Sequence, residues 1–236
     1  MGASVRGPEH RRTGLPNQDA WMSRLTHGTL LAVVCDGLGS RPHSATGSRL
    51  ACVAVADAVR HWAAQSTVPP EMLFRLVHAL WNVRVHATGH DACATTCLFA
   101  VVTKDGRLLL AQLGDGLVML KTPQGTTTLE PPSDRFGNAT TGLGIAADVR
   151  EWRFHFEPHF TGAASILLAT DGVADDLLPE KRTDFLTFLI NQYGEQPALQ
   201  RSRAIAKQLR KWPTPRHLDD KTVAVLWNDA TTEDTQ

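Results

Sequence analysis

LLAVVCDGLGS at residues 30–40 and SILLATDGVADD at residues 165–176 decide the fold. In each stretch a continuous apolar run leads directly into an Asp-Gly pair, at Asp36 and at Asp171. Such runs predict buried strands, and the glycine allows a sharp turn where the aspartate side chain leaves the core. Because hard divalent cations bind oxygen, two carboxylates at strand ends indicate a metal site.

Further acidic residues follow or precede other predicted strands, in Gly114-Asp115-Gly116 and in Asp219-Asp220. One Asp-Gly pair is a common turn, whereas this repetition favours a shared site. An unpaired buried carboxylate is costly, so a metal role is preferred for Asp36 and Asp171 together. Asp115 alone is equally well explained as a turn residue, and Asp175 and Asp176 begin a predicted helix, where carboxylates are favourable without any metal.

Composition restricts the class of protein. The chain has 236 residues, 42% of them hydrophobic, with 24 basic and 24 acidic side chains. This predicts a single folded domain over residues 1–230 with a disordered tail at 231–236. The zero net charge gives no sign of a nucleic-acid or anionic-membrane binder. The absence of a bilayer-length apolar run and of a signal peptide leads us to expect a cytoplasmic protein, and the four cysteines, all in apolar segments, to be buried free thiols.

The order of predicted elements favours an α+β fold. The elements are strands at about 19–23 and 29–35, helices at about 44–65 and 70–89, an antiparallel meander from 95 to 130, a strand pair near 152–156 and 165–169, helices at about 180–193 and 196–211, and a strand at 223–227. This order does not alternate as βαβ units do, which argues against a doubly wound parallel sheet. Residues 131–148 are rich in turn formers and predict a long surface loop with a functional role.

Six short motifs resemble those of the metal-dependent protein phosphatases of type 2C, the PPM family, and occur in the family's order. They are Asn17-Gln18-Asp19, Val34-Cys35-Asp36-Gly37, Ala94-Thr95-Thr96, Leu113-Gly114-Asp115-Gly116, Ala169-Thr170-Asp171-Gly172 with Asp175, and Asp219-Asp220-Lys221-Thr222, the last resembling the family's Asp-Asn-x-Thr. The resemblance spans nearly the whole chain. It implies a four-layer α-β-β-α sandwich, in which two antiparallel sheets are flanked by helix pairs and metals bind at one end.

The resemblance also implies the roles of individual residues. Two Mn²⁺ or Mg²⁺ ions would activate a bridging hydroxide for direct attack on phosphorus, without a covalent enzyme intermediate. The implied ligands are Asp36, which bridges the two ions, the Gly37 carbonyl, Asp171 and Asp219, with Asp115 and Asp175 for a third, looser ion. Asp19 and Gln18 would orient these ligands without binding the ions directly, although Asp19 could also be a plain strand-end turn residue.

An arginine that grips the substrate phosphate is expected before the first acidic motif. Arg12 is our choice, so the implied catalytic residues are Asp36, Asp171 and Arg12. Arg6 and Arg11 remain alternatives, and a solvated basic loop without such a role is the remaining interpretation.

Two positions depart from the family pattern. Gln18 stands where many members have glutamate, and Leu38 follows Asp36-Gly37 where animal members have a histidine proposed as general acid. A metal-bound water or another residue would then protonate the leaving group. His43 is near in sequence, but we expect it to be an exposed loop histidine.

The leading prediction is a phosphoserine/phosphothreonine protein phosphatase that acts on a phosphorylated protein and opposes a Ser/Thr kinase, with no nucleic-acid or membrane partner. Hydrolysis of small phosphomonoesters would use the same site. The alternative is a non-catalytic, phosphoprotein-binding regulatory pseudophosphatase, for which Gln18 and Leu38 are the arguments. A nucleotide-binding role fails, because neither Gly142-Leu143-Gly144 nor Gly37-Leu38-Gly39 completes the glycine fingerprint of a βαβ unit.

Overall fold

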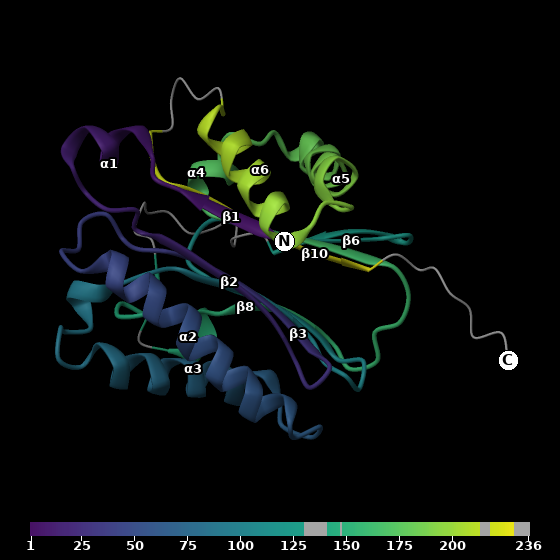
Figure 1. Cartoon of the computed structure of the whole chain (residues 1–236). Helices are drawn as coiled ribbons and strands as arrows, with labels where there is room; N and C mark the ends of the chain where they lie inside the picture. The colour runs from purple at the N-terminus through teal and green to yellow at the C-terminus, as the bar shows by residue number, and fades with distance from the viewer. Residues whose placement is uncertain (130–140, 147, 213–217, 229–236) are drawn as a thin grey trace, which may run out of the picture.

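The computed structural model describes residues 1–129, 141–146, 148–212 and 218–228. Two five-stranded antiparallel sheets make up its centre (Figure 1). The first contains, in spatial order, β1 (Gly2–Val5), β10 (Lys221–Asn228), β9 (Ala164–Ala169), β6 (Leu117–Thr122) and β7 (Gly125–Thr128). The second contains β2 (Asp19–Thr26), β3 (Thr29–Asp36), β4 (Cys97–Val102), β5 (Leu108–Leu113) and β8 (Arg153–Glu157).

Helices cover both outer faces. The described α-helices are α1 (Pro8–Thr13), α2 (Ser44–Ala63), α3 (Pro70–Val85), α4 (Asp171–Ala174), α5 (Arg182–Tyr193) and α6 (Ala198–Arg210). The pair α2 and α3 packs on the second sheet, and the pair α5 and α6 packs on the first (Figure 1). The predicted four-layer sandwich of antiparallel sheets is therefore confirmed. Of the described helices, none combines the length and the apolar character that crossing a membrane requires.

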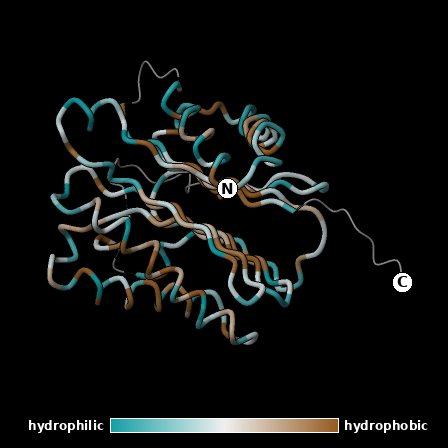
Figure 2. The backbone as a smooth tube through the Cα atoms, viewed as in Figure 1, coloured by the Kyte–Doolittle hydropathy of each residue, from teal (hydrophilic) through white to brown (hydrophobic). Residues whose placement is uncertain are grey.

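The layers are held together by three apolar cores. The inner core lies between the sheets and includes Val34, Leu98, Leu110 and Leu168. The two outer cores lie between each sheet and its helices, so the strands are hydrophobic on both faces and form the brown centre of Figure 2. Burial on both faces explains why the strand segments appear in the sequence as continuous apolar runs rather than alternating ones. All four cysteines are buried and free, as predicted.

Helix α2 approaches its neighbours closely because it is rich in small residues. Gly47 lies in its first turns, and a Cβ at this position would lie 1.7 Å from the carbonyl oxygen of Cys93. The carbonyl oxygen of Gly47 accepts a hydrogen bond from the Trp81 indole of α3 at 3.0 Å. The glycine thus lets the helix pair and the chain before β4 pack together.

Gly47→Ala should destabilise the protein, although alanine normally favours a helix over glycine. The expected clash is with backbone, so it cannot be relieved by a side-chain rotation. Overpacking of this kind costs about 1–3 kcal/mol or more, which for a domain of this size lowers Tm by roughly 2–12 °C. Thermal unfolding measures the effect. Gly39→Ala is the control, because its Cβ would meet only Gln18 Oε1 at 3.6 Å; equal Tm values for the two variants would contradict the close contact.

The link between β5 and β6 corrects the predicted meander. These two strands lie in different sheets. Gly114 and Gly116 have φ angles of 97° and 101°, a region that favours glycine, and they let the chain cross from one sheet to the other within three residues. The predicted meander over 95–130 is therefore two hairpins, β4–β5 and β6–β7, in opposite sheets. The predicted strand pair near 152–156 and 165–169 is wrong for the same reason, since β8 pairs with β5 and β9 with β6 and β10.

Other expectations differ from the structure or fall outside the described residues. The strand β1 and the helix α1 were not predicted, because each is short and lies among turn residues. Asp175 does not begin a helix but caps the end of α4. Most of the predicted surface loop at 131–148 lies outside the described residues, as does the predicted tail at 231–236. In the described part of that loop, Leu143 is fully buried and pairs with Thr95 through two backbone hydrogen bonds.

Candidate active site

The predicted carboxylates lie at one end of the two sheets. Asp36 ends β3 and is paired directly with Asp19, the first residue of β2. In the other sheet, the end of β9 pairs with the beginning of β10. Asp171 follows β9 and Asp219 precedes β10, so these two carboxylates lie at the corresponding end of their sheet.

The backbone around Asp36 is fixed by Thr95 and Thr96 of the motif Ala94-Thr95-Thr96. The Asp36 N–H donates to Thr96 Oγ1 at 2.9 Å, and the Thr95 hydroxyl donates to the Asp36 carbonyl at 2.8 Å. A Cβ at Gly37 would lie 2.6 Å from the Ser44 carbonyl oxygen, so only glycine fits there. The sharp turn therefore holds the Asp36 carboxylate at the end of the sheet.

Negative charge is concentrated around Asp36. Burial, and then the charges of Asp19, Asp171 and Asp219, raise the pKa of Asp36 well above its usual value. Burial, followed by the charges of Asp115 and Asp219, raises the pKa of Asp171 to about 6. Such mutual repulsion between carboxylates is what bound divalent cations would offset. The electrostatics thus fit a cation site whose ligands include Asp36 and Asp171.

Asp19 lies within the sheet, beside Asp36. Its Oδ2 accepts a hydrogen bond from the Thr170 hydroxyl at 2.9 Å. Its Oδ1 is buried and has no hydrogen-bond partner among the described residues, and burial raises the pKa of Asp19 to about 7. A buried oxygen with no protein partner, beside Asp36, is consistent with a residue that orients a ligand or a water of a metal site.

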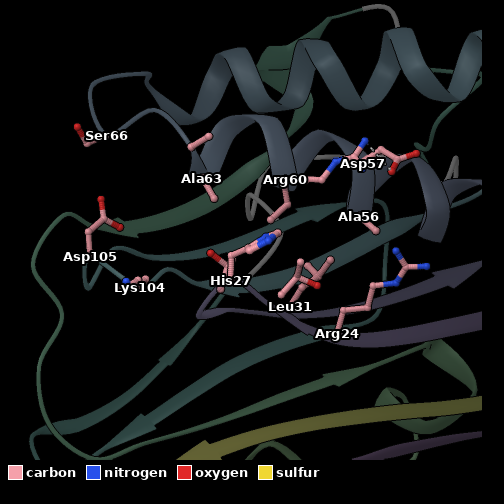
Figure 3. A pocket seen from close by; sticks show the side chains of 14 residues that line it. Arg24, His27, Leu31, Ala56, Asp57, Arg60, Ala63, Ser66, Lys104 and Asp105 are labelled. Carbon is pink, nitrogen blue, oxygen red and sulfur yellow. Dashed lines mark ion pairs between the residues drawn. The ribbon is translucent and has the colours of Figure 1, made fainter.

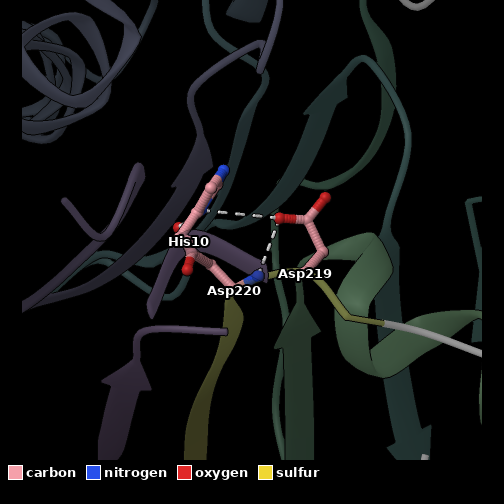
Figure 4. A group of neighbouring side chains, drawn as sticks. All are labelled: His10, Asp219 and Asp220. Atoms are coloured by element: carbon pink, nitrogen blue, oxygen red, sulfur yellow. Dashed lines mark hydrogen bonds and ion pairs between the residues drawn. The ribbon is translucent and has the colours of Figure 1, made fainter. Parts of the chain in front are cut away.

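A tighter group of possible ligand atoms lies beside the predicted set. Within the described ranges, His10, Asp219 and Asp220 form the group whose ligand atoms all come within 4.8 Å of one another (Figure 4). Asp220 Oδ1 accepts the Gly7 N–H at 2.6 Å, and Oδ2 accepts the Gln18 N–H at 2.6 Å and His10 Nδ1 at 2.9 Å. Since protein donors already occupy both oxygens of Asp220, this group is a hydrogen-bonded cluster rather than an open cage for an ion.

The predicted ligands Asp36, Asp171 and Asp219 do not form so tight a group in the described part of the chain. Their donor set consists only of oxygens, which suits Mg²⁺ or Mn²⁺ rather than thiolate-preferring metals. Mg²⁺ commonly binds through one or two carboxylates and keeps several of its waters. The residues therefore fit hydrated divalent cations, bound partly through water.

The remaining predicted ligands are exposed. Asp115 lies in the crossing between β5 and β6, where its charge reaches Asp171. Asp175 lies one turn after Asp171, at the end of α4. The exposure of both side chains is compatible with the expected third, loosely held ion.

The predicted phosphate-binding arginine lies on α1. The Arg12 side chain is 72% exposed and binds Glu9, with Nε donating to Glu9 Oε2 at 3.0 Å. The alternatives bind backbone: Arg11 Nε donates to the Arg6 carbonyl, and the Arg6 guanidinium donates to the Leu15 carbonyl. Among these three side chains, Arg12 is therefore the one held by a carboxylate that a substrate phosphate could replace.

The positions that depart from the family pattern have clear structural surroundings. Gln18 is buried, and its carbonyl accepts hydrogen bonds from the Gly37 N–H and the Ser48 hydroxyl. Its backbone thus joins the first acidic motif to the Asp36 turn. Leu38 is half-buried and bonded through its N–H to the Ala94 carbonyl. His43 is exposed at the start of α2, as expected.

Two residues with prominent contacts at the site, His10 and Asp220, were given no role of their own from the sequence. Asp220 was named only within the acidic pair Asp219-Asp220 and the motif Asp219-Asp220-Lys221-Thr222, where the resembling motif has asparagine. Nothing in the sequence around His10 indicates its contact with Asp220, 210 positions away.

A cavity of about 640 Å³ lies away from this site (Figure 3). It is formed by the turn between β2 and β3, the second half of α2 and the turn after β4. Leu31, Ala56 and Val59 line it, with Arg24 and Lys104 among its charged residues. Because Asp19 and Asp36 are at the opposite ends of β2 and β3, this cavity is not part of the predicted site.

Comparisons with known proteins agree with the fold. Residues 6–212 match the family Protein phosphatase 2C. The photosystem II phosphatase PBCP is similar with a TM-score of 0.67 at 16% identity, covering 98% of each chain. The phosphatase MsPP from Mycobacterium smegmatis, in complex with cacodylate, has a TM-score of 0.61 at 17% identity, covering 97% of each chain. RsbX in complex with magnesium has a TM-score of 0.58 at 16% identity, covering 95% of this chain and 92% of that one. No curated protein sequence matches.

The chain belongs to the protein phosphatase 2C family, since the match covers most of its length. It is therefore classed as a protein-serine/threonine phosphatase, a phosphoric monoester hydrolase of a metal-dependent family. This confirms the resemblance seen in the six motifs. The low identity to the solved structures means that they bear on the fold alone.

Proposed function

We propose that this protein hydrolyses phosphoserine and phosphothreonine monoesters on a protein substrate, with two Mn²⁺ or Mg²⁺ ions held by Asp36, the Gly37 carbonyl, Asp171 and Asp219. The observation that carries this proposal is the convergence of carboxylates at Asp36, where the charges of Asp19, Asp171 and Asp219 add to burial in raising the pKa of Asp36. Asp115 and Asp175 are proposed to hold a third ion more loosely. The substrate is the product of a Ser/Thr kinase, which this protein opposes in a signalling pathway.

Divalent cations at such a site would activate water for in-line attack and offset the charge of the phosphoryl oxygens. The protein's own contribution is to fix the ligands. Thr95 and Thr96 hold the Asp36 backbone, and Thr170 orients Asp19 beneath it. The Gly172 N–H donates to Asp171 Oδ1 at 2.6 Å, which fixes one oxygen of this carboxylate.

The leaving oxygen of serine or threonine needs a proton, and Leu38 cannot supply one. Leu38 occupies the position after Asp36-Gly37, and His43 is exposed at the start of α2. We propose that water within the site donates this proton. The protein would then depend less on a side-chain acid than family members that carry a histidine next to this Asp-Gly pair.

The test compares hydrolysis of p-nitrophenyl phosphate and a phosphothreonine peptide, with and without Mn²⁺, by the wild type and by Asp171→Asn. Mn²⁺-dependent turnover of both substrates that is lost in the variant would support the proposal. A much higher kcat/KM for the peptide would identify proteins, rather than small phosphomonoesters, as substrates. Tight phosphopeptide binding by a metal-loaded wild type without turnover would contradict it and favour a regulatory pseudophosphatase.

Arg12→Ala should raise KM for the phosphothreonine peptide by about 10–100-fold, since hydrogen bonds to charged groups contribute roughly 1.5–3 kcal/mol. A substrate phosphate must displace Glu9 from Arg12, so Glu9→Gln should change KM in the opposite direction. Steady-state kinetics of Arg6→Ala and Arg11→Ala test the alternatives. Arg24→Ala, at the distant cavity, is the matched control; if Arg12→Ala behaves like this control, Arg12 does not bind phosphate.

A further inference from the structure

Three hydrogen bonds converge on the side chain of Asp220. The donors are the N–H groups of Gly7 and Gln18 and the imidazole Nδ1 of His10. All three come from residues 6–18, the segment between β1 and β2 that contains α1, which we call the N-terminal arm. The side chain of Asp220 is 1% exposed and that of His10 is 12% exposed. A single buried carboxylate therefore holds both ends and the helix of this arm.

The geometry requires a carboxylate at this position. Each oxygen of Asp220 accepts a backbone N–H at 2.6 Å. An asparagine has one accepting oxygen and an amide nitrogen that donates, so it would turn a donor toward one of these N–H groups. Because Oδ2 accepts, His10 Nδ1 must carry a hydrogen. Asp220 and His10 are therefore complementary, at a position where the resembling family motif has asparagine.

The arm is pressed against the residues that precede β10. A Cβ at Gly7 would lie 2.3 Å from the carbonyl carbon and oxygen of Asp219, and the Glu9 N–H donates to the Leu218 carbonyl at 3.0 Å. His10 Nδ1 lies 4.0 Å from Asp219 Oδ1 (Figure 4). The pair Asp219-Asp220 thus contains both the carboxylate that holds the arm and a proposed metal ligand, Asp219. The arm and this ligand are therefore positioned by the same short segment.

We propose that His10 and Asp220 form a positioning pair that fixes the N-terminal arm against Asp219 and thereby sets where the arm's arginines meet the substrate. The role in substrate binding rests on the proposed phosphatase function, whereas the role in fixing the arm does not. Neither residue is assigned to touch the substrate. Both act through the backbone of the arm, which carries Arg6, Arg11 and Arg12 beside the carboxylate end of the sheets.

The first measurement is amide hydrogen exchange by NMR, which needs no catalytic activity. In His10→Ala, the amides of Gly7 and Gln18 should exchange at least about tenfold faster, because loss of one donor to a charged acceptor loosens the other two. The amide of Leu168 in β9 is the internal reference. His10→Asn, which can place an N–H near the position of Nδ1, should restore slow exchange. Unchanged exchange at Gly7 and Gln18 in His10→Ala would overturn the proposal.

The second measurement separates binding from chemistry. His10→Ala should raise KM for the phosphothreonine peptide by about tenfold. Its kcat should stay within twofold of the wild-type value, and the Mn²⁺ concentration for half-maximal activity should not change. His10→Asn should return KM most of the way to the wild-type value. His61→Ala, an exposed histidine of α2, controls for loss of an imidazole. A fall in kcat with an altered Mn²⁺ requirement would overturn the proposal, because His10 would then act at the metals. Fast amide exchange at Gly7 and Gln18 with an unchanged KM would overturn the role in substrate binding and leave only a structural contact. No hydrolysis by the wild type would contradict the proposed function while leaving the exchange result interpretable.

Discussion

Replacing Asp36 with asparagine should lower kcat/KM for the phosphothreonine peptide by about 10³-fold or more. Asparagine has nearly the same size, but it removes the charge that is proposed to bridge two cations. Metal ions contribute several kcal/mol of transition-state charge stabilisation, and each 1.36 kcal/mol corresponds to tenfold in rate. Steady-state kinetics at saturating Mn²⁺ measures the loss. Asp184→Asn is the matched control, because Asp184 is a solvent-exposed residue of α5 in an ion pair with Lys181.

The same variant should be more stable than the wild type when metal is removed. Burial and the charges of three neighbouring carboxylates oppose the ionised form of Asp36, and asparagine removes that repulsion. Each kcal/mol relieved raises Tm by about 2–4 °C for a domain of this size. Loss of activity together with a higher Tm in EDTA would identify Asp36 as a residue kept for function. A lower Tm in EDTA would mean instead that asparagine disturbs the turn, and the activity loss would not then identify a ligand.

The layers of the fold could be predicted because burial on both faces leaves a direct mark on the sequence. The runs that end at Asp36 and at Ala169 are strands of opposite sheets, each packed between the partner sheet and a helix pair. The assignment of strands to sheets could not be predicted. The crossing at Gly114-Asp115-Gly116 has the same composition as a hairpin turn, and only the three-dimensional path distinguishes them. Gly2–Val5 was missed because a four-residue strand gains its stability from its partner β10 rather than from local propensity.

Part of the candidate site could be predicted from the sequence for a similar reason. Asp36 and Asp171 each follow an apolar strand, so their side chains had to lie at strand ends, and the structure brings their charges within mutual influence. Metal coordination itself remains a prediction. The contacts of His10 with Asp220 were inaccessible, since they join positions 210 residues apart and depend on how the arm folds back onto β10. The helix α1 is bounded by Gly7 and Gly14, and its Pro8 start could have been noticed as a helix signal.

Removing divalent cations with EDTA should abolish hydrolysis and lower the Tm of the wild type, and adding Mn²⁺ should restore both. A ligand that binds only the folded state at 100 times its Kd stabilises it by about 2.7 kcal/mol, which corresponds to a shift of roughly 5–11 °C for a domain of this size.

Asp171→Asn tests whether this stabilisation comes from the proposed site. Burial, and then the charges of Asp115 and Asp219, raise the pKa of Asp171 to about 6, so cation binding should relieve more repulsion in the wild type than in the variant. We expect Mn²⁺ to raise the Tm of the wild type and of Asp184→Asn equally, and that of Asp171→Asn by less than half as much. Equal Tm shifts in all three proteins would mean that the stabilising cation binds elsewhere. The clustering of carboxylates around Asp36 would then need another explanation.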